Sequence, residues 1–481
     1  MVSFAILNSE NIHIKNLQFD YERPTMSELS IVSASSQSIE AAVHPDSKYW
    51  IDNGKLTWYG EGWKNNSSHA IVFRPGDETM HYSSFKPFAA GSVVETSPGH
   101  LTFTGDFSRL QFEPGDVLTV RDPYRDNCGA FIHLSKNIRI EQLQMHYMHG
   151  LGIVSQFSEN ISLVKVSVAP RKNSGRVISS FADCFHFSGC RGKIIVDSCF
   201  TSGSHDDPVN VHGTHLQIVA IENDKKIRAR FMHHQTWGFS ALFANDSIVF
   251  INPQTLMPVA LASIRNARLV NKREMEIELK GQLPHDLEIG DCIENSTWTP
   301  EVIIRNSRFE RTNTRGLLIT TRRKVLIENN IFSRTGMHAI LIADDALSWY
   351  ESGPVRDVTI RNNVFEECGY NSAPGNYVIA IAPENHQLVP GFMVHQNICI
   401  ENNIFKVYDY PLLTARSTGH LIFRNNAIVQ TNFMQPGAAR PAFMLTACAD
   451  VTIEKNDFKT TMKPAVDMVN MSNAELKTDI R

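Results

Sequence analysis

The sequence lacks the features that mark several large classes of protein. No uninterrupted apolar run approaches the ~20 residues that a membrane-spanning helix requires, so we predict no membrane span. Lysine and arginine form no dense run, and the net charge is only −4 over 481 residues. This balance argues against a nucleic-acid or membrane-surface partner. The N-terminal segment MVSFAILNSENIHIKNLQFDY has no basic stretch followed by an apolar core, so it shows no secretory signal peptide.

Metal-binding and disulfide signatures are scarce as well. The eight cysteines include no C-x-x-C pair, which disfavours a zinc site. Cys184, Cys190 and Cys199 cluster in the sequence, but two of them lie in or beside apolar runs, and we predict buried thiols rather than disulfides. Neither a metal nor another cofactor is predicted. Helical periodicity is scarce throughout, which leaves β-structure as the main class.

What the sequence does contain is a repeat. The segments NIHIKNLQFDY (11–21) and NIRIEQLQMHY (137–147) are identical at six of eleven positions. The template returns as VIIRNSRFERT (302–312), VLIENNIFSRT (325–335), VTIRNNVFEEC (358–368), ICIENNIFKVY (398–408), LIFRNNAIVQ (421–430) and VTIEKNDFKT (451–460). Each copy alternates apolar and polar residues and then reaches a turn residue, usually Asn. The shortest spacing, 23 residues from 302 to 325, fits one coil of a parallel β-helix whose turn asparagines form ladders. A leucine-rich repeat would need an L-x-x-L-x-L pattern and a helical return, and neither is present.

Two segments interrupt the repeat, and both are rich in short alternating strands and turns. They end alike, in FEPGDVLTVRD (112–122) and LEIGDCIEN (287–295). We interpret them as small β-barrels or sandwiches inserted into loops, with extended meanders as the alternative. The predicted fold is all-β: a parallel β-helix with two inserted β-barrel-like domains. The predicted organisation is a first coil at 1–21, insert 1 at 22–129, further coils at 130–215, insert 2 at 216–299 and the remaining coils at 300–481.

A second strand in each coil aligns a column of polar residues. The strands are LGIV (151–154), FHF (185–187), VNV (209–211), LLI (317–319), ILI (340–342) and VIA (378–380). The residues two positions before them are His149, Asp183, Asp207, Arg315, His338 and Asn376, and Asp206 adjoins Asp207. Stacked coils would space this column by one strand, ~4.8 Å. Solvated turns do not repeat charges at one register position, so we predict a functional site. Like charges so close raise one another's pKa, while Arg315 and the histidines can hold an ionised partner.

Clustered aspartates suit glycoside hydrolysis. That reaction needs one protonated carboxylic acid at the leaving oxygen and one carboxylate opposite it. If the carboxylate activates water, the two groups lie ~6.5–9.5 Å apart and the anomeric centre inverts. Asp183 on one coil, facing Asp206 and Asp207 on the next, is predicted to reach that separation. Asp207 beside Asp206 would help to keep one carboxyl group protonated near neutral pH.

Other polar and aromatic residues have two interpretations each. His205 and His212 flank the aspartate pair, and either turn packing or substrate contact explains them. Asp344 and Asp345 form a rival pair, which we place on a different edge of the helix with a structural or second-site role. Trp237 and Trp349 are candidate sugar-stacking surfaces or core residues.

The segments ADCFHFSGC and GSHDDPVNVHGTHLQI, together with the two inserts and ILIADDALSWYESGPV, resemble glycoside hydrolase family 110 over nearly the whole chain. These are bacterial exo-acting α-1,3-galactosidases. The resemblance implies a right-handed helix, metal-independent hydrolysis with inversion, and a terminal α-1,3-linked galactose as on blood-group-B and linear α-Gal glycans. By position it makes Asp183 the general acid and Asp206 and Asp207 the general-base pair. Substrate-binding candidates are His149, Arg315, His338, His205 and Trp237. Family members are normally exported, so a periplasmic or secreted location is expected, although this sequence shows no signal peptide. A homo-oligomer is possible.

Three other functions stay open at this point. A polygalacturonase-type hydrolase also uses paired aspartates but needs a basic groove for uronates, and the column holds one Arg and two His. A pectate lyase needs calcium and a basic proton acceptor. A tailspike-like or adhesin-like β-helix that only binds glycans would tolerate Asp183→Ala.

Overall fold

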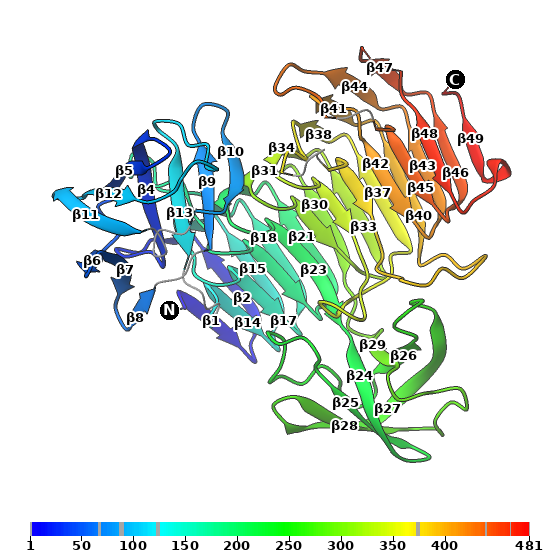
Figure 1. Ribbon diagram of the computed structural model, residues 1–481. Coiled ribbons are helices and arrows are strands. Elements are labelled where there is room, and N and C mark those ends of the chain that lie inside the picture. Colours follow the sequence, from blue (N-terminus) through cyan, green and yellow to red (C-terminus); the bar gives the residue numbers. More distant parts are fainter. Residues whose placement is uncertain are drawn as a thin grey trace.

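The computed structural model describes residues 2–65, 69–85, 91–121, 126–371, 376–437, 440–461 and 463–480. It is a parallel β-helix with two inserted β domains, which confirms the predicted fold class (Figure 1). Three long parallel sheets run along the helix axis, and successive coils add one strand to each. In this part of the chain the single helical element is the short 3-10 turn η1 (Asn473–Glu475).

The first of the three sheets carries the candidate site. Its strands are β1 (Phe4–Leu7), β14 (Ala130–His133), β17 (Ile153–Gln156), β20 (Phe185–Ser188), β23 (Val209–Thr214), β32 (Leu317–Ile319), β35 (Ile340–Ile342), β39 (Ile379–Ile381), β42 (Leu413–Arg416), β45 (Phe443–Thr446) and β48 (Val466–Val469), with β36 (Glu351–Ser352) antiparallel to β23.

The first half of each copy of the sequence repeat forms a strand of the second sheet. Its strands are β2 (Glu10–Lys15), β15 (Lys136–Glu141), β18 (Glu159–Val164), β21 (Arg191–Asp197), β30 (Glu301–Arg305), β33 (Lys324–Glu328), β37 (Asp357–Arg361), β40 (His395–Glu401), β43 (Thr418–Arg424), β46 (Ala449–Glu454) and β49 (Leu476–Thr478). The third sheet follows after the turn. Its strands are β3 (Gln18–Phe19), β16 (Gln144–Met145), β19 (Ser167–Val168), β22 (Phe200–Ser204), β31 (Arg308–Thr312), β34 (Ile331–Thr335), β38 (Val364–Glu366), β41 (Ile404–Val407), β44 (Ala427–Gln430) and β47 (Asp457–Lys459).

The Asn-Asn dipeptides of the repeat form the turn between the second and third sheets. The first Asn adopts the left-handed conformation, as at Asn329 (φ 56°) and Asn402 (φ 56°), which Asn tolerates better than most residues. The second Asn joins a buried ladder. In it Asn330 donates to Asn363, which donates to Asn403, through side-chain N–H groups 3.0 and 3.1 Å from the acceptor oxygen. The predicted asparagine ladder is therefore confirmed.

Apolar residues of the repeat fill the interior of the coils. The inward residues of all three sheets form one core, in which Phe309, Phe332, Phe365 and Phe405 stack with ring centroids 4.7–5.4 Å apart. Because coil stacks on coil, one deleted ring leaves a cavity beside both neighbours. The core thus fixes the positions of the outward side chains on the first sheet.

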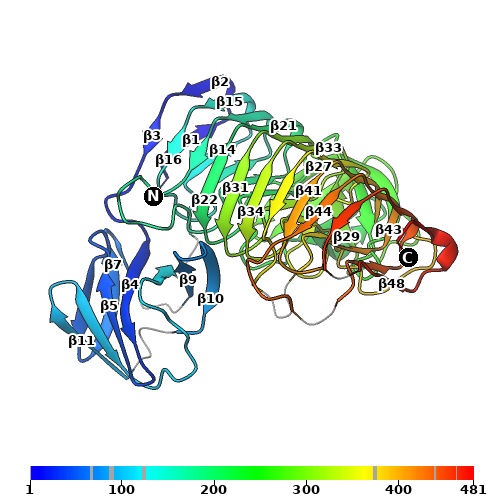
Figure 2. The ribbon, with the colours of Figure 1, turned by 90° about the horizontal axis from the view of Figure 1, so that it is seen from above.

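The first insert is a seven-stranded antiparallel sheet and a three-stranded sheet. Its strands are β4 (Met26–Ala34), β5 (Ser38–Val43), β9 (Ala70–Arg74), β10 (Thr79–Ser83), β11 (Ser92–Ser97), β12 (His100–Thr104) and β13 (Val117–Arg121), with β6 (Tyr49–Asp52), β7 (Lys55–Gly60) and β8 (Trp63–Asn65) in the smaller sheet. It lies beside the N-terminal coils (Figures 1 and 2). Phe73 and Met80 of the insert share a buried cluster with Phe181 and Ala182 of the helix, next to Asp183 in the chain.

The second insert is a closed barrel that projects from the middle of the helix (Figure 1). Its strands are β24 (Leu216–Asn223), β25 (Lys226–Arg230), β26 (Ser247–Ile251), β27 (Pro258–Asn271), β28 (Glu274–Leu279) and β29 (Cys292–Asn295). Val249 and Ile251 of the barrel pack with Ala346 and Tyr350 of a coil loop. This contact brings the barrel loop 231–246 over the outer face of the first sheet. In the described residues, no helix has the length and apolarity needed to cross a membrane.

Candidate active site

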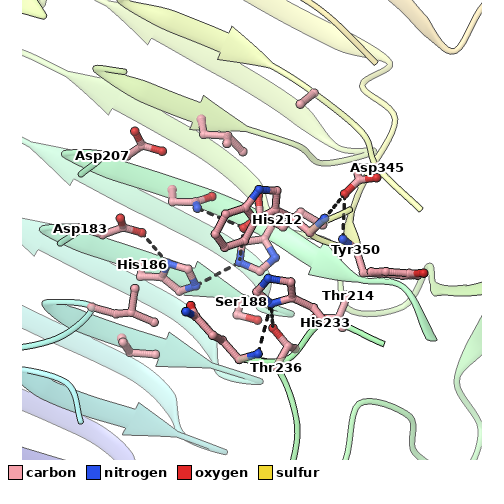
Figure 3. Close-up of a pocket in the computed structure, with 18 of the residues that line it drawn as sticks. Asp183, His186, Ser188, Asp207, His212, Thr214, His233, Thr236, Asp345 and Tyr350 are labelled. Carbon is pink, nitrogen blue, oxygen red and sulfur yellow. Dashed lines mark hydrogen bonds and ion pairs between the residues drawn. The ribbon is translucent and has the colours of Figure 1, made fainter. Parts of the chain in front are cut away.

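A cavity of about 510 Å³ lies on the outer face of the first sheet. Its floor comes from β17, β20, β23, β32 and β35, and the barrel loop and the loop 343–351 form its walls (Figure 3). The lining residues are Leu151, Val154, Gln156, Asp183, His186, Ser188, Asp206, Asp207, Asn210, His212, Thr214, His233, Gln235, Thr236, Trp237, Gly238, Phe239, Arg315, Leu318, Leu341, Ala343, Asp345, Trp349, Tyr350, Glu351 and Glu384. A volume of this size suits one or two sugar rings.

The strand register places most of the predicted column together. The first residues of the paired strands are Ile153, Phe185, Val209, Leu317, Ile340 and Ile379. The residues two positions before them are Leu151, Asp183, Asp207, Arg315, His338 and Tyr377. Asp183, Asp207, Arg315 and His338 therefore share one register position. The predicted places of His149 and Asn376 in the column are wrong, because their strands begin later than the sequence suggested.

The three aspartates form one cluster. Asp183 and Asp207 are buried, while the Asp206 side chain is 22% exposed and faces the cavity. One carboxylate oxygen of each residue lies within 4.8 Å of the other two. This approach is closer than the ~6.5–9.5 Å predicted for a water-activating pair. The separation of the carboxyl groups as wholes stays a prediction.

Arg315 neutralises the most buried member of the cluster. Its Nε and Nη2 donate to Asp207 Oδ2 over 3.2 and 2.8 Å, and its backbone N–H donates to Oδ1 over 3.2 Å. Thr314 donates its hydroxyl to the same Oδ1 over 2.9 Å. The pKa of Asp207 is raised to about 7, mainly by burial; Arg315 opposes the rise, and Asp206 and Asp183 add to it. A coupled cluster of this kind retains a proton near neutral pH.

Asp183 is held by a pair of histidines on the floor. Asp183 Oδ2 is hydrogen-bonded to His186 Nδ1 over 2.7 Å, and His186 Nε2 to His212 Nε2 over 3.0 Å (Figure 3). His212 Nδ1 in turn donates to the Gly213 carbonyl oxygen over 2.6 Å. All three side chains are nearly buried. Their connection fixes the orientation of the Asp183 carboxyl group.

Two floor residues present polar atoms that the described residues do not satisfy. The Asn210 Oδ1 and Thr214 Oγ1 atoms are buried and have no hydrogen-bond partner there, and both residues line the cavity. The Asn210 amide nitrogen donates to Glu351 over 3.4 Å, which orients Oδ1. Buried polar atoms without partners are costly. Hydroxyl groups of a bound sugar would supply the hydrogen bonds that these two atoms lack.

Aromatic residues form the rim. Trp349, 49% exposed, packs on His233 of the barrel loop with ring centroids 4.6 Å apart. Trp237, 44% exposed, also lines the cavity, and Lys272 lies over its ring. Exposed indoles at the mouth of a polar cavity can stack on the apolar face of a sugar ring. Their exposure contradicts the alternative that they are core residues, and sugar stacking stays a prediction.

Asp345 lies in the same cavity wall, so the prediction that it faces a different edge is wrong. Its carboxylate accepts backbone N–H groups of Leu347, Ser348, Trp349 and Tyr350. Four such donors hold the loop that carries Trp349. Asp344 is buried beneath it and accepts the Gly353 N–H over 3.1 Å.

Three predicted substrate-binding histidines do not line the cavity. His149 is buried against the first insert, with Nδ1 2.6 Å from the Thr25 hydroxyl and its ring edge-on to Phe181. His205 is buried and contacts the Thr119 hydroxyl of β13 over 2.7 Å. His338 keeps its register position, but its Nδ1 donates to the Tyr377 carbonyl oxygen over 2.5 Å. Packing against the first insert and neighbouring coils accounts for these positions.

Sequence reasoning missed His186, Asn210 and Glu351. The alternation in FHF and VNV, continued to His212, places His186, Asn210 and His212 on the outer face. The period-two pattern was a usable signal for these residues. Glu351 reaches the site through β36, whose antiparallel pairing with β23 had no sequence signature.

The three carboxylates are close enough to surround a cation. However, Arg315 already matches the charge of Asp207, and Asp183 is paired with His186. Acidic clusters also occur without ions.

The fold and site define a class of carbohydrate-active β-helix protein, and comparison with known proteins gives the family. The family models "GLAA-B beta-barrel domain I" and "GLAA-B beta-barrel domain II" match residues 27–118 and 226–293. The model "Right handed beta helix region" matches residues 291–479, so the helix is right-handed.

Relatives match over nearly the full chain. "Alpha-1,3-galactosidase A" of Bacteroides fragilis (strain YCH46) is 46% identical over 100% of this chain and 80% of its own length. "Alpha-1,3-galactosidase A" of Bacteroides thetaiotaomicron is 38% identical over 95% of this chain and 79% of its own length. "Alpha-1,3-galactosidase B" of the same species is 35% identical over 95% of this chain and 75% of its own length. The chain belongs to glycoside hydrolase family 110, the family of these galactosidases.

Proposed function

We propose that this protein is an exo-acting glycosidase that removes terminal α-1,3-linked galactose from glycans, with inversion and without a metal. The observation that carries the proposal is the Asp183, Asp206 and Asp207 cluster, which lies in a sugar-sized cavity of a chain similar to α-1,3-galactosidases. Three carboxyl groups with a retained proton supply both the acid and the base that glycosidic hydrolysis needs.

In the proposed mechanism Asp183 is the general acid. It donates its proton to the glycosidic oxygen while the bond from that oxygen to the anomeric carbon breaks. Asp206, the exposed carboxylate, accepts a proton from the water whose oxygen bonds to the anomeric carbon. Asp207, held by Arg315, keeps negative charge beside the developing oxocarbenium ion. The products are galactose and the freed sugar hydroxyl, and one proton returns through solvent from Asp206 to Asp183.

Substrate recognition is proposed to divide between floor and rim. Asn210 Oδ1 and Thr214 Oγ1 accept or donate hydrogen bonds to galactose hydroxyls. Trp349 and Trp237 stack on the sugar that leaves or on galactose itself. This arrangement does not favour a uronate substrate, because Arg315 is the one Arg or Lys among the described lining residues and Asp207 occupies it.

The test is galactose release from a panel of disaccharides. Galα1-3Gal and a blood-group-B trisaccharide should both yield galactose, while Galα1-4Gal and Galα1-6 substrates should not. EDTA should leave the rate unchanged, and added calcium should not raise it. Binding without release, unchanged in Asp183→Ala, would instead identify a glycan-binding protein.

A further inference from the structure

The number of protons on the side chains of Asp183, His186 and His212 follows from their hydrogen bonds. Three hydrogen bonds connect Asp183, His186, His212 and the Gly213 carbonyl oxygen in series, at 2.7, 3.0 and 2.6 Å. Each contact needs one hydrogen between its two heavy atoms. Two neutral imidazoles bring one hydrogen each. The third hydrogen is therefore additional, and the group carries one proton more than an ionised aspartate with two neutral histidines.

The position of that proton follows from the end of the series. A carbonyl oxygen can only accept, so His212 carries its hydrogen on Nδ1. Burial lowers the pKa of His212, which keeps its Nε2 unprotonated. His186 must then donate from Nε2 to His212, which leaves the His186 Nδ1 lone pair directed at Asp183. The additional proton lies in the contact between Asp183 and His186.

We propose that His212, fixed by the Gly213 carbonyl, locks His186 in the tautomer that retains the proton Asp183 donates in catalysis. This inference rests on the proposed function, in which Asp183 is the general acid. His186 and His212 act through Asp183 and are positioning residues. If His186 were free to carry its hydrogen on Nδ1, it would donate to Asp183 and favour the ionised carboxylate, which cannot act as an acid.

The charges around the group support the same outcome. The carboxylates of Asp206 and Asp207 lie within 4.8 Å of an Asp183 oxygen and disfavour its ionisation. Arg315 points to Asp207 and is engaged there. Glu351 is the exception: its Oε1 lies 3.7 Å from His212 Nε2 and favours a proton there, but burial of the ring outweighs it and the pKa of His212 is lowered. The remaining titratable residues around the cavity are Asp345, Glu384, His233 and Tyr350.

In the chemical step the additional proton leaves the Asp183–His186 contact for the glycosidic oxygen. The Asp183 carboxylate then faces the lone pair of His186, and this unfavourable contact draws a proton back from cavity water after the product leaves. No redox change and no covalent intermediate on His186 are involved. The net reaction consumes one water per glycosidic bond.

The first experiment compares His186→Gln and His212→Gln with the parent across pH. Both should move the basic limb of kcat/KM to lower pH by at least one unit. Both should lose about 10²-fold at neutral pH on Galα1-3Gal, the usual worth of a general acid, and much less on a nitrophenyl galactoside, whose leaving group needs little protonation.

The matched control is His133→Gln. His133 has the same register position as His212 three strands away in the first sheet, and it does not line the cavity. This variant should keep the parent pH profile. Equal losses on both substrates in His186→Gln and His212→Gln, with an unmoved basic limb, would mean a structural role only and would overturn the proposal.

The second experiment measures the tautomer in the parent chain and uses a variant only to assign the signal. In ¹⁵N-histidine NMR of the parent chain, His212 should show a protonated Nδ1 and an unprotonated Nε2, the tautomer that free histidine disfavours in water. Whichever of the two Gln variants folds assigns the signal. A protonated His212 Nε2 would refute the lock. An inactive parent chain would refute the proposed function instead, and the NMR result would still decide the tautomer.

Discussion

Arg315 and Asp207 lie two residues before adjacent strands, yet they are 108 residues apart in the chain, because the entire second insert separates β23 from β32. The guanidinium of Arg315 donates two N–H groups to Asp207 Oδ2. The two successive coils therefore stay paired although the barrel is inserted between them. The pair counteracts the rise in the Asp207 pKa that burial and the two neighbouring carboxylates cause. It thereby links the stability of the helix at this point to the chemistry of the cluster.

Arg315→Met should destabilise the fold and abolish activity. Removing one partner leaves the buried Asp207 unpaired, which costs on the order of 2 kcal/mol for a pair whose Arg is partly exposed. Thermal unfolding measures the loss. The double variant Arg315→Met with Asp207→Leu should recover stability but not turnover. A single variant as stable as the parent would contradict the assigned role of the pair.

Asp183→Asn should lower turnover of Galα1-3Gal by about 10² to 10⁴-fold, the usual contribution of a general acid. Hydrolysis of a nitrophenyl galactoside should suffer less, because its leaving group needs little protonation. Asp206→Asn should impair both substrates to a similar degree, since water activation is common to both. Steady-state rates on the two substrates separate these patterns. If Asp206→Asn spares the nitrophenyl substrate instead, the acid and base assignments must be exchanged.

The coils were predictable from sequence because each repeat copy has the alternation of a strand. In the copies with two consecutive asparagines, the first Asn marks the turn and the second forms the ladder. The column of the site was predictable only where the second strand starts with its first apolar residue, as at Phe185, Val209 and Leu317. At LGIV it failed, because Gly150 and Gly152 adopt φ of 62° and 66° and the strand begins at Ile153. No local signal shows such a turn inside an apolar run.

The direction of side chains near the inserts could also not be predicted from the sequence. His205 precedes the aspartate pair but packs on Thr119 of the first insert, because the backbone turns between Ser204 and Asp207. Likewise Glu351 and Trp349 reach the cavity through a loop whose course is set by Asp345 and the barrel. The His205–Thr119 contact joins residues 86 positions apart, and no periodicity encodes it.

Asp344→Asn should stabilise the protein more at pH 7.5 than at pH 4.5. Burial raises the pKa of Asp344 to about 6, against an ordinary value of 3.8. The unfolded chain therefore releases this proton first, and the parent loses stability as pH rises from about 4 to about 6. Asparagine keeps an oxygen to accept the Gly353 N–H and has no charge to bury.

Thermal unfolding at the two pH values measures the difference. Asp345→Asn is the control, because its carboxylate accepts four backbone N–H groups and its loss should destabilise at both values. An Asp344→Asn effect that does not change with pH would show that its burial carries no ionisation cost.

Trp349→Ala should raise KM for Galα1-3Gal about 3- to 10-fold with little change in kcat, which corresponds to about 0.5–1.5 kcal/mol of lost stacking. Trp50→Ala is a matched control, because Trp50 is 40% exposed in the first insert and does not line the cavity. Its kinetics should equal those of the parent. A fall in kcat without a change in KM would place Trp349 in the chemical step rather than in binding.

The stereochemical outcome is the prediction that the distances alone do not decide. Oxygens of the three aspartates approach within 4.8 Å, which is shorter than the ~6.5–9.5 Å typical of inverting pairs and near the ~5–5.5 Å typical of retaining ones. Both Asp207 oxygens accept hydrogen bonds from Arg315 and Thr314, so Asp207 is poorly placed to attack carbon. Asp206 is the carboxylate open to the cavity, and it can serve either as a base or as a nucleophile. Proton NMR of the first product should show β-galactose from an α-linked substrate, because water attacks from the opposite face. If α-galactose forms first, Asp206 is the nucleophile, and a covalent galactosyl ester on it should be trapped by a fluorinated galactoside and found by mass spectrometry.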